Sequence, residues 1–102
     1  MTYATKAESA IARLCEVAQR GTGQAQIVAD FLLAWWNADE CGGFDLTDLW
    51  AVDAEIAVDM MMVISTIRCK RCYPDALGFE TEFNAIVQRW RPHLLQKEAR
   101  HG

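Results

Sequence analysis

Four cysteines and two histidines are the residues in this sequence best suited to redox or metal chemistry. Cys69 and Cys72 form the only short cysteine spacing in the chain. A redox dithiol works best at the start of a helix, where the dipole lowers a thiol pKa, but this pair lies at the end of a predicted helix. Zinc would need two more ligands, and the candidates are scattered: Cys15, Cys41, His93 and His101. We therefore predict no metal ion and no cofactor, and keep a metal-binding or redox helical module using Cys69 and Cys72 as an alternative.

Carboxylates are concentrated in the first part of the chain. The sequence has 14 acidic and 10 basic residues, for a net charge of −4, and no Lys or Arg occurs between Gly21 and Ile67. Such a run can attract a divalent cation, imitate phosphates on a basic protein surface, or simply cap helices. The candidates for an acidic surface are Asp39, Glu40, Asp45, Asp48, Asp53, Glu55 and Asp59.

The negative net charge argues against nucleic acid as a partner. The basic residues that could still form a positive patch are Arg68, Lys70, Arg71, Arg89 and Arg91. No sequence motif for reading nucleic acid accompanies them. We therefore do not expect nucleic acid to bind.

Catalytic motifs are missing from the sequence. A nucleophile needs a nearby base, and the only histidines, His93 and His101, lie in or beside a predicted polar tail. Gly21-Thr22-Gly23 is too short for a phosphate-binding loop and does not follow a predicted strand. Neither a nucleophile elbow nor a dinucleotide-binding motif is present. We therefore predict that the protein is not an enzyme.

Four tryptophans are many for a chain of 102 residues. Trp35 and Trp36 are neighbours, and neighbours on a helix point about 100° apart, so both are buried only if the helix is covered on two sides. Tryptophan is enriched as an anchor of protein interfaces. We predict that one of this pair lies at an interface, although a fully buried pair is the competing interpretation. The interface candidates are Trp35, Trp36, Phe44 and Trp50.

Apolar residues repeat at three- and four-residue steps in four segments, which predicts helices. These segments are 4–19, 24–37, 53–69 and 79–90, and a short extra turn is predicted near 46–51. Glycines and short polar residues predict a loop over 37–43, and Asp45 and Asp53 are predicted N-caps. The third helix begins with acids and ends with bases, which complements its dipole. Pro92 ends the last helix, one further turn follows, and a polar tail begins at about residue 96.

The whole sequence predicts one compact all-α domain over residues 1–102, built as a bundle of about four principal helices. Apolar residues make up 52% of the chain and charged residues 24%, which argues against disorder. The sequence has neither a run of 18 apolar residues nor a leader-like N-terminus. We therefore expect no membrane association and a cytoplasmic location.

Several stretches of the chain carry a family resemblance: Phe31 to Ala38, Cys41 to Trp50, Tyr73 to Gly78 and Arg89 to Pro92. They resemble a family of small uncharacterised proteins from bacterial plasmids and integrative elements. The resemblance covers most of residues 27–92. It implies a mobile-element setting, and because the family has no known activity it brings no catalytic residues.

The surplus of tryptophans, the second helix with two apolar faces and the missing catalytic motifs predict a non-enzymatic protein-interaction module. We expect a mobile-element accessory protein that binds a protein partner or a second copy of itself as a homodimer. An acidic inhibitor of a host nucleic-acid-targeting defence system, with a phosphate-mimicking surface, is a further alternative.

Overall fold

The computed structural model describes residues 5–95, and within this range it contains helices and no strand. The elements are α1 (Lys6–Ala18), α2 (Gly23–Cys41), η1 (Leu46–Ala51), α3 (Ala54–Lys70), η2 (Pro74–Leu77) and α4 (Glu80–Trp90), where η denotes a 3₁₀ helix. Residues 92–95 add one more helical turn after α4. The predicted all-α bundle with four principal helices and a short turn at 46–51 is confirmed. The predicted tail from residue 96 lies outside the described residues.

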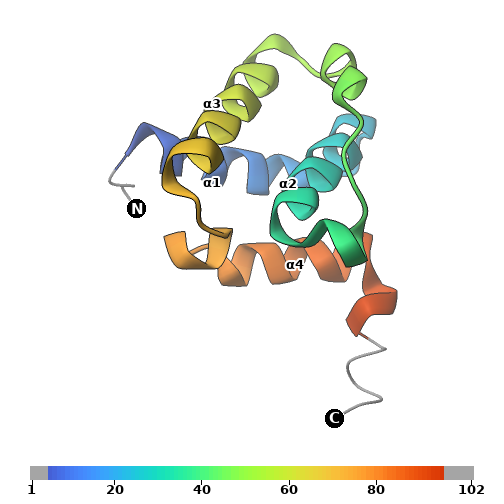
Figure 1. Cartoon of the computed structure of the whole chain (residues 1–102). Coiled ribbons are helices and arrows are strands. Elements are labelled where there is room, and N and C mark those ends of the chain that lie inside the picture. Colours follow the sequence, from blue (N-terminus) through green and yellow to red (C-terminus); the bar gives the residue numbers. More distant parts are fainter. Residues whose placement is uncertain (1–4, 96–102) are drawn as a thin grey trace.

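Helix α1 lies at the centre of the bundle (Figure 1). It packs against α2 and α3, and α4 crosses α1 and α2 on the side away from α3. Its apolar residues recur at helical spacing, and Ala10, Ile11 and Leu14 are fully buried. From α4, Phe83 and Ile86 close the other side of the same core. Burial of these side chains supplies most of the favourable free energy of folding.

Threonines start the first two helices. The Thr5 hydroxyl accepts a hydrogen bond from the Glu8 amide at 3.0 Å, and the Thr22 hydroxyl accepts one from the Ala25 amide at 3.2 Å. Each bond satisfies an amide that has no partner within its own helix. The local sequence therefore sets where α1 and α2 begin.

The loop predicted over 37–43 is wrong up to Cys41, because α2 continues to that residue. Asn37 breaks the helical geometry, with φ of −163° and ψ of 83°, and its side-chain oxygen accepts a hydrogen bond from the Glu40 amide at 3.3 Å. Asn37 thus acts as an internal cap for one last turn. The turn ends at Gly42, whose φ of 97° favours glycine. Burial of Cys41 against the core explains why the chain stays helical there.

Helix α3 is less buried than the other long helices. It packs chiefly against α1, and only Met60 and Val63 are fully buried. The consecutive methionines point in different directions, since Met61 is 55% exposed while Met62 is half-buried. Asp53 holds the predicted N-cap position, but its side chain makes no cap bond.

Asp53 instead joins the start of α3 to the start of α2. Its amide donates to the Gln24 side-chain oxygen at 2.6 Å, and the Gln24 amide group donates to the Asp53 carboxylate at 3.3 Å. This reciprocal pair replaces the predicted cap. It fixes the position of α3 relative to α2, so the carboxylate serves the tertiary structure instead of its own helix.

The end of α4 ties together the ends of α1 and α2. The Trp90 indole donates to the Ala18 carbonyl at 2.7 Å, and the Arg89 guanidinium donates to the Arg20 carbonyl at 3.1 Å. The Arg91 guanidinium donates to the Cys41 carbonyl at 3.0 Å and forms an ion pair with Asp30 at 2.7 Å. These carbonyls lack intrahelical donors because they lie at helix ends. Three consecutive residues, Arg89, Trp90 and Arg91, therefore bind the backbone carbonyls at the ends of two helices.

We predict that Arg91→Ala lowers the free energy of unfolding by about 2 kcal/mol, because it leaves the half-buried Asp30 carboxylate and the Cys41 carbonyl without their donor. Urea denaturation followed by circular dichroism measures the change. Arg20→Ala is the matched control: the Arg20 side chain is exposed, and its loss should change stability by less than about 0.5 kcal/mol. Equal losses in the two variants would contradict the role assigned to Arg91.

Candidate functional site

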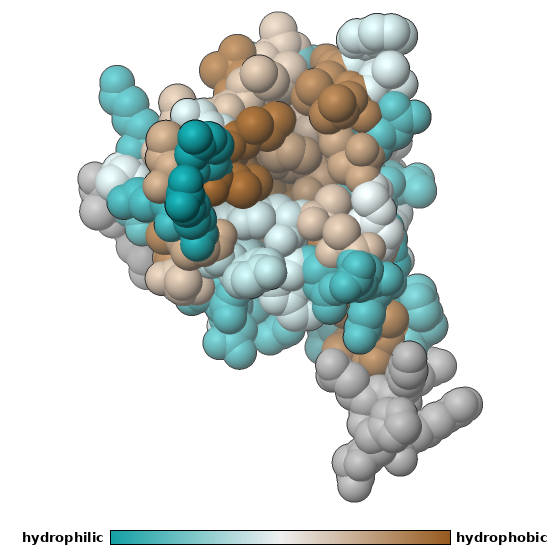
Figure 2. Space-filling view, viewed as in Figure 1, coloured by the Kyte–Doolittle hydropathy of each residue, from teal (hydrophilic) through white to brown (hydrophobic). Residues whose placement is uncertain are grey.

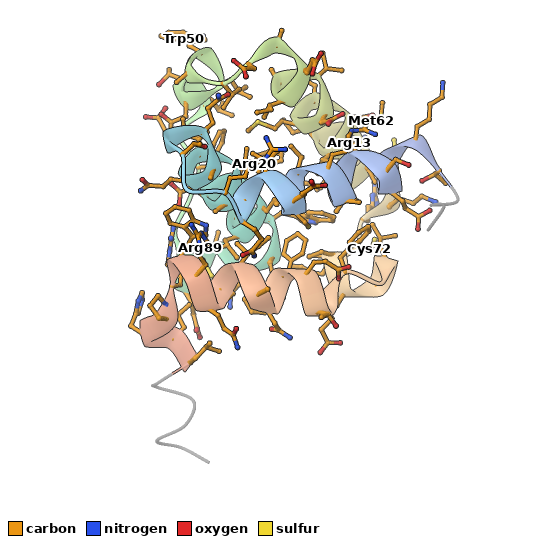
Figure 3. The ribbon with its side chains drawn as sticks, turned by 180° about the vertical axis from the view of Figure 1, so that it is seen from behind. Arg13, Arg20, Trp50, Met62, Cys72 and Arg89 are labelled. Atoms are coloured by element: carbon orange, nitrogen blue, oxygen red, sulfur yellow. The ribbon has the colours of Figure 1, made fainter. Side chains whose placement is uncertain are left out.

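The most exposed large apolar side chains of the described residues lie on η1. Trp50 is 85% exposed and Leu46 is 69% exposed. Trp50 projects from the outer edge of the molecule, away from the core (Figure 3). A tryptophan in water loses the free energy that burial would supply, so its exposure needs an explanation other than folding.

Asp45 caps η1 and orders its first residues. Its carboxylate accepts hydrogen bonds from the Thr47 amide at 2.9 Å and from the Thr47 hydroxyl at 2.8 Å. These bonds favour the ionised carboxylate and lower the pKa of Asp45 below its ordinary value. The predicted cap at Asp45 is therefore present, and it orders the short turn that displays Trp50.

The other predicted interface residues already make contacts within the fold. The Trp35 indole donates to the Cys72 carbonyl at 3.0 Å, and its ring meets the edge of Phe83 with the centroids 5.8 Å apart. The Phe44 ring meets the edge of Phe31 at 5.3 Å. Trp36 is half-buried and lines a cavity of about 190 Å³ with Leu94 and Leu95. Of the four candidates, Trp50 is the one that the structure leaves exposed.

A hollowed apolar face lies between α3 and the segment that carries η1 (Figure 2). Brown, apolar atoms gather on both sides of this hollow. The apolar side chains of these two elements that are half-buried against the core include Leu49, Ile64 and Ile67. The exposed residues of η1 therefore stand beside a surface that is itself only partly covered.

The acidic candidates do not form a single free surface. Asp59 accepts two hydrogen bonds from Arg13, at 2.8 and 2.9 Å, and its side chain is only 14% exposed. That bond raises the pKa of Arg13. Asp45 and Asp53 make the contacts described above. The acids without such a contact are Asp39, Glu40 and Glu55, which are exposed, and Asp48, which is half-exposed.

Cys69 and Cys72 lie where the sequence predicts, at the end of α3. Cys69 is exposed and Cys72 is half-buried, and Arg71 between them adopts the left-handed conformation that ends the helix, with φ of 52°. Across residues 5–95, no three His, Cys, Asp or Glu side chains converge as a metal site would require. The structure thus brings neither Cys15, Cys41 nor His93 to this pair.

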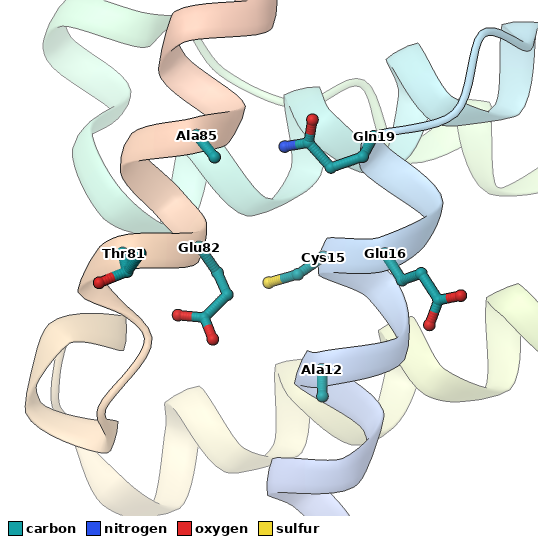
Figure 4. A pocket seen from close by; sticks show the side chains of 7 residues that line it. All are labelled: Ala12, Cys15, Glu16, Gln19, Thr81, Glu82 and Ala85. Carbon is teal, nitrogen blue, oxygen red and sulfur yellow. The ribbon is translucent and has the colours of Figure 1, made fainter. Parts of the chain in front are cut away.

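Cys15 lines a pocket between α1 and α4 of about 350 Å³ (Figure 4). Its sulfur points toward the carboxylate of Glu82 across this pocket. Burial, and secondly the nearby charge of Glu82, raise the pKa of Cys15 to about 12. A thiol that stays protonated at neutral pH is a poor nucleophile, so this pocket does not resemble a cysteine active site.

A family of unknown function, DUF7673, matches residues 8–91 of the chain. The chain belongs to this family. No curated protein and no solved structure matches it significantly. The family match covers the four long helices except the first residues of α1, and it includes residues 27–91 of the stretch that carries the sequence resemblance. Within the described range, no helix of this DUF7673 protein is long and apolar enough to cross a membrane.

Two features of this DUF7673 protein were not predicted from its sequence. One is the pairing of acids with distant bases, Asp30 with Arg91 and Asp59 with Arg13, which no local pattern indicates. The other is the exposed pair Val58 and Met61 on α3. The sequence could have indicated this exposure, because Val58 and Met61 both lie off the helical stripe that includes Met60 and Val63.

We predict that a thiol reagent at neutral pH labels Cys69 quickly and Cys72 more slowly in the folded protein, and labels Cys15 and Cys41 only after unfolding. The last two are 5% and 4% exposed, and burial raises the pKa of both. Mass spectrometry of the labelled peptides measures the order. Fast native labelling of Cys15 would contradict the buried position.

We also predict that the protein loses stability as pH rises from about 9 toward 12. The thiol of Cys15 ionises near 9.0 in the unfolded chain but only near 12 in the folded protein. Between these two values only the unfolded chain loses the proton, so each rise in pH lowers the free energy of unfolding. Each such proton contributes about 1.4 kcal/mol per pH unit. Cys15→Ala should reduce the pH dependence of the free energy of unfolding between these two pH values. Identical pH dependence in Cys15→Ala and wild type would refute this explanation.

Proposed function

We propose that this DUF7673 protein is a non-enzymatic protein-interaction module that binds a protein partner through η1. The observation that carries the proposal is the exposure of Trp50 on a turn ordered by the Asp45 cap. Tryptophan is the residue most enriched among the side chains that dominate interface energies. Leu46 beside it and the hollowed apolar face toward α3 supply the surrounding contact area (Figure 2).

The ordering of η1 supports this choice of surface. A short turn whose backbone is already ordered loses little backbone conformational entropy when a partner binds, which favours affinity. The other tryptophans already have partners within the fold, since Trp35 and Trp90 each donate a hydrogen bond to a backbone carbonyl. Trp50 makes no such bond in the described part of the chain, so burial by a partner would cost it no existing contact.

The competing predictions receive less support from the geometry. A phosphate-mimicking inhibitor needs free carboxylates on one face, but Asp53 and Asp59 are bonded to Gln24 and Arg13. A metal or redox module needs further ligands or a lowered thiol pKa at Cys69 and Cys72, and their surroundings offer neither three convergent ligands nor a helix start. Two of the five bases proposed for a positive patch, Arg89 and Arg91, are bonded to backbone carbonyls.

The biological setting that we propose is that of an accessory protein encoded by a plasmid or an integrative element. This rests on the resemblance of Phe31 to Ala38 and Cys41 to Trp50 to small proteins of such elements. The second of these stretches contains η1 entirely. A binding surface in that stretch would make the partner a protein that such an element encounters in its host.

We predict that Trp50→Ala weakens partner binding at least about thirtyfold without unfolding the protein. Because Trp50 is 85% exposed, the substitution should change the free energy of unfolding by less than about 0.5 kcal/mol, while losing an interface anchor costs about 2 kcal/mol or more. The measurement compares proteins captured from the native host by wild type and variant, quantified by mass spectrometry and repeated with purified partner.

The matched control is Tyr73→Ala, which removes another exposed aromatic side chain, 63% exposed, after the end of α3. A partner retained by Tyr73→Ala and lost by Trp50→Ala supports η1 as the surface. A partner retained equally by both variants would contradict it.

A further inference from the structure

The outward face of α3 carries an apolar stripe. Ala54, Val58, Met61 and Ser65 are all exposed and follow one another at steps of four, three and four residues. This spacing places them on one side of the helix. Val58 is 62% exposed and Met61 is 55% exposed, so two large apolar side chains stand in water at its centre.

The opposite side of α3 is packed against the rest of the chain. Met60 and Val63 are its fully buried residues, and α3 packs chiefly on α1. Ile56 and Ile67 lie on this inner side and pack against the core. A helix with apolar residues on opposite faces is expected to be covered on both, and here only the inner face is covered by the described chain.

Charges flank the exposed stripe in an ordered way. Glu55 lies at the beginning of α3, whereas Arg68, Lys70 and Arg71 lie at or just after its end, and all four are exposed. Among the described residues, Glu55 and Arg68 make neither an ion pair nor a side-chain hydrogen bond. The face is therefore acidic at one end, apolar in the middle and basic at the other.

We propose that α3 binds α3 of a second copy of this chain, antiparallel, about a two-fold axis near Met61. Two-fold symmetry brings the same patch of both copies together, so the patch must be complementary to itself. Glu55 lies six residues before Met61, and Arg68 lies six residues after Met62. An axis between Met61 and Met62 thus brings each Glu55 beside Arg68 of the second copy.

Charge decides the orientation of this pair. Each helix is about 25 Å long, so its charged ends are too far apart to interact within one copy and meet only across the interface. The antiparallel arrangement forms two attractive pairs, whereas a parallel arrangement would place Glu55 against Glu55 and Arg68 against Arg68. Val58 and Met61 are buried at the centre.

This inference goes beyond the proposed function, because it concerns a different surface and a different partner. The stripe lies on α3 and its occupant is a second copy, whereas Trp50 and Leu46 lie on η1 and would bind another protein. Loss of the dimer would leave the prediction for Trp50→Ala standing, and loss of partner binding would leave the dimer standing. The two ideas can therefore fail separately.

The decisive experiment reverses the two charges in separate chains and then mixes them. Glu55→Lys alone places Lys against Arg68, and Arg68→Glu alone places Glu against Glu55, so each variant should dimerise at least about tenfold more weakly than wild type. An equimolar mixture of the two variants restores both attractive pairs and should form a heterodimer with near wild-type affinity. Sedimentation velocity over a concentration series measures all three.

Further outcomes test the proposal and separate the two arrangements. A wild-type chain that remains monomeric at its highest soluble concentration overturns the proposal. The double variant Glu55→Lys/Arg68→Glu restores both attractive pairs only in an antiparallel homodimer, so a monomeric double variant would indicate a parallel pair and also overturn it. Circular dichroism of each variant checks folding, which both exposed substitutions should leave intact.

A second variant tests the apolar centre of the stripe. Met61→Glu brings two carboxylates to the two-fold axis and should make the protein monomeric. Gln26→Glu is the matched control, because it adds the same charge at an exposed position on α2 and should leave the dimer intact. A dimer that survives Met61→Glu would place the interface elsewhere and refute the proposal.

Discussion

Arg91 lies where the end of α4 meets the last turn of α2, and its guanidinium donates to two backbone carbonyls and to the Asp30 carboxylate. Together with Trp90 on the Ala18 carbonyl, it fixes α4 across both α1 and α2. The position of α4 in turn supplies Phe83, which meets the Trp35 ring. Trp35 holds the Cys72 carbonyl and hence the chain that leaves α3. The arrangement of all four helices therefore depends on the few polar bonds at their ends.

This arrangement accounts for part of the charge asymmetry of the sequence. The first part of the chain is acidic and the last part basic, and the fold pairs them, as Asp30 with Arg91 shows. Arg13 and Asp59 form a similar pair between α1 and α3. Partly buried charges such as these orient elements as well as stabilising them, because an alternative arrangement would leave one of them unpaired. An acidic stretch in sequence is thus not an acidic face in space.

Local patterns predicted the helices but could not predict how their ends are joined. The spacing of Ile11 and Leu14, and of Phe83 and Ile86, indicates helix faces directly, because the period of the helix is a local property. The extension of α2 to Cys41 was missed, since it depends on burial against the core and on Arg91, fifty residues away. Among the site residues, the sequence could name Trp50 as a candidate, but its exposure and the occupation of Trp35 follow only from tertiary contacts.

Helices α2 and α3 show why an apolar pattern alone does not identify an interface. Both carry apolar residues around most of their circumference. The chain covers α2 from two sides, with α1 on one and α4 on another, so Leu32 and Leu33 are fully buried although they point apart. Helix α3 has α1 as its main neighbour, and Val58 and Met61 remain in water. What distinguishes a core helix from an interface helix is the number of neighbours that the fold supplies, and that number is a property of topology.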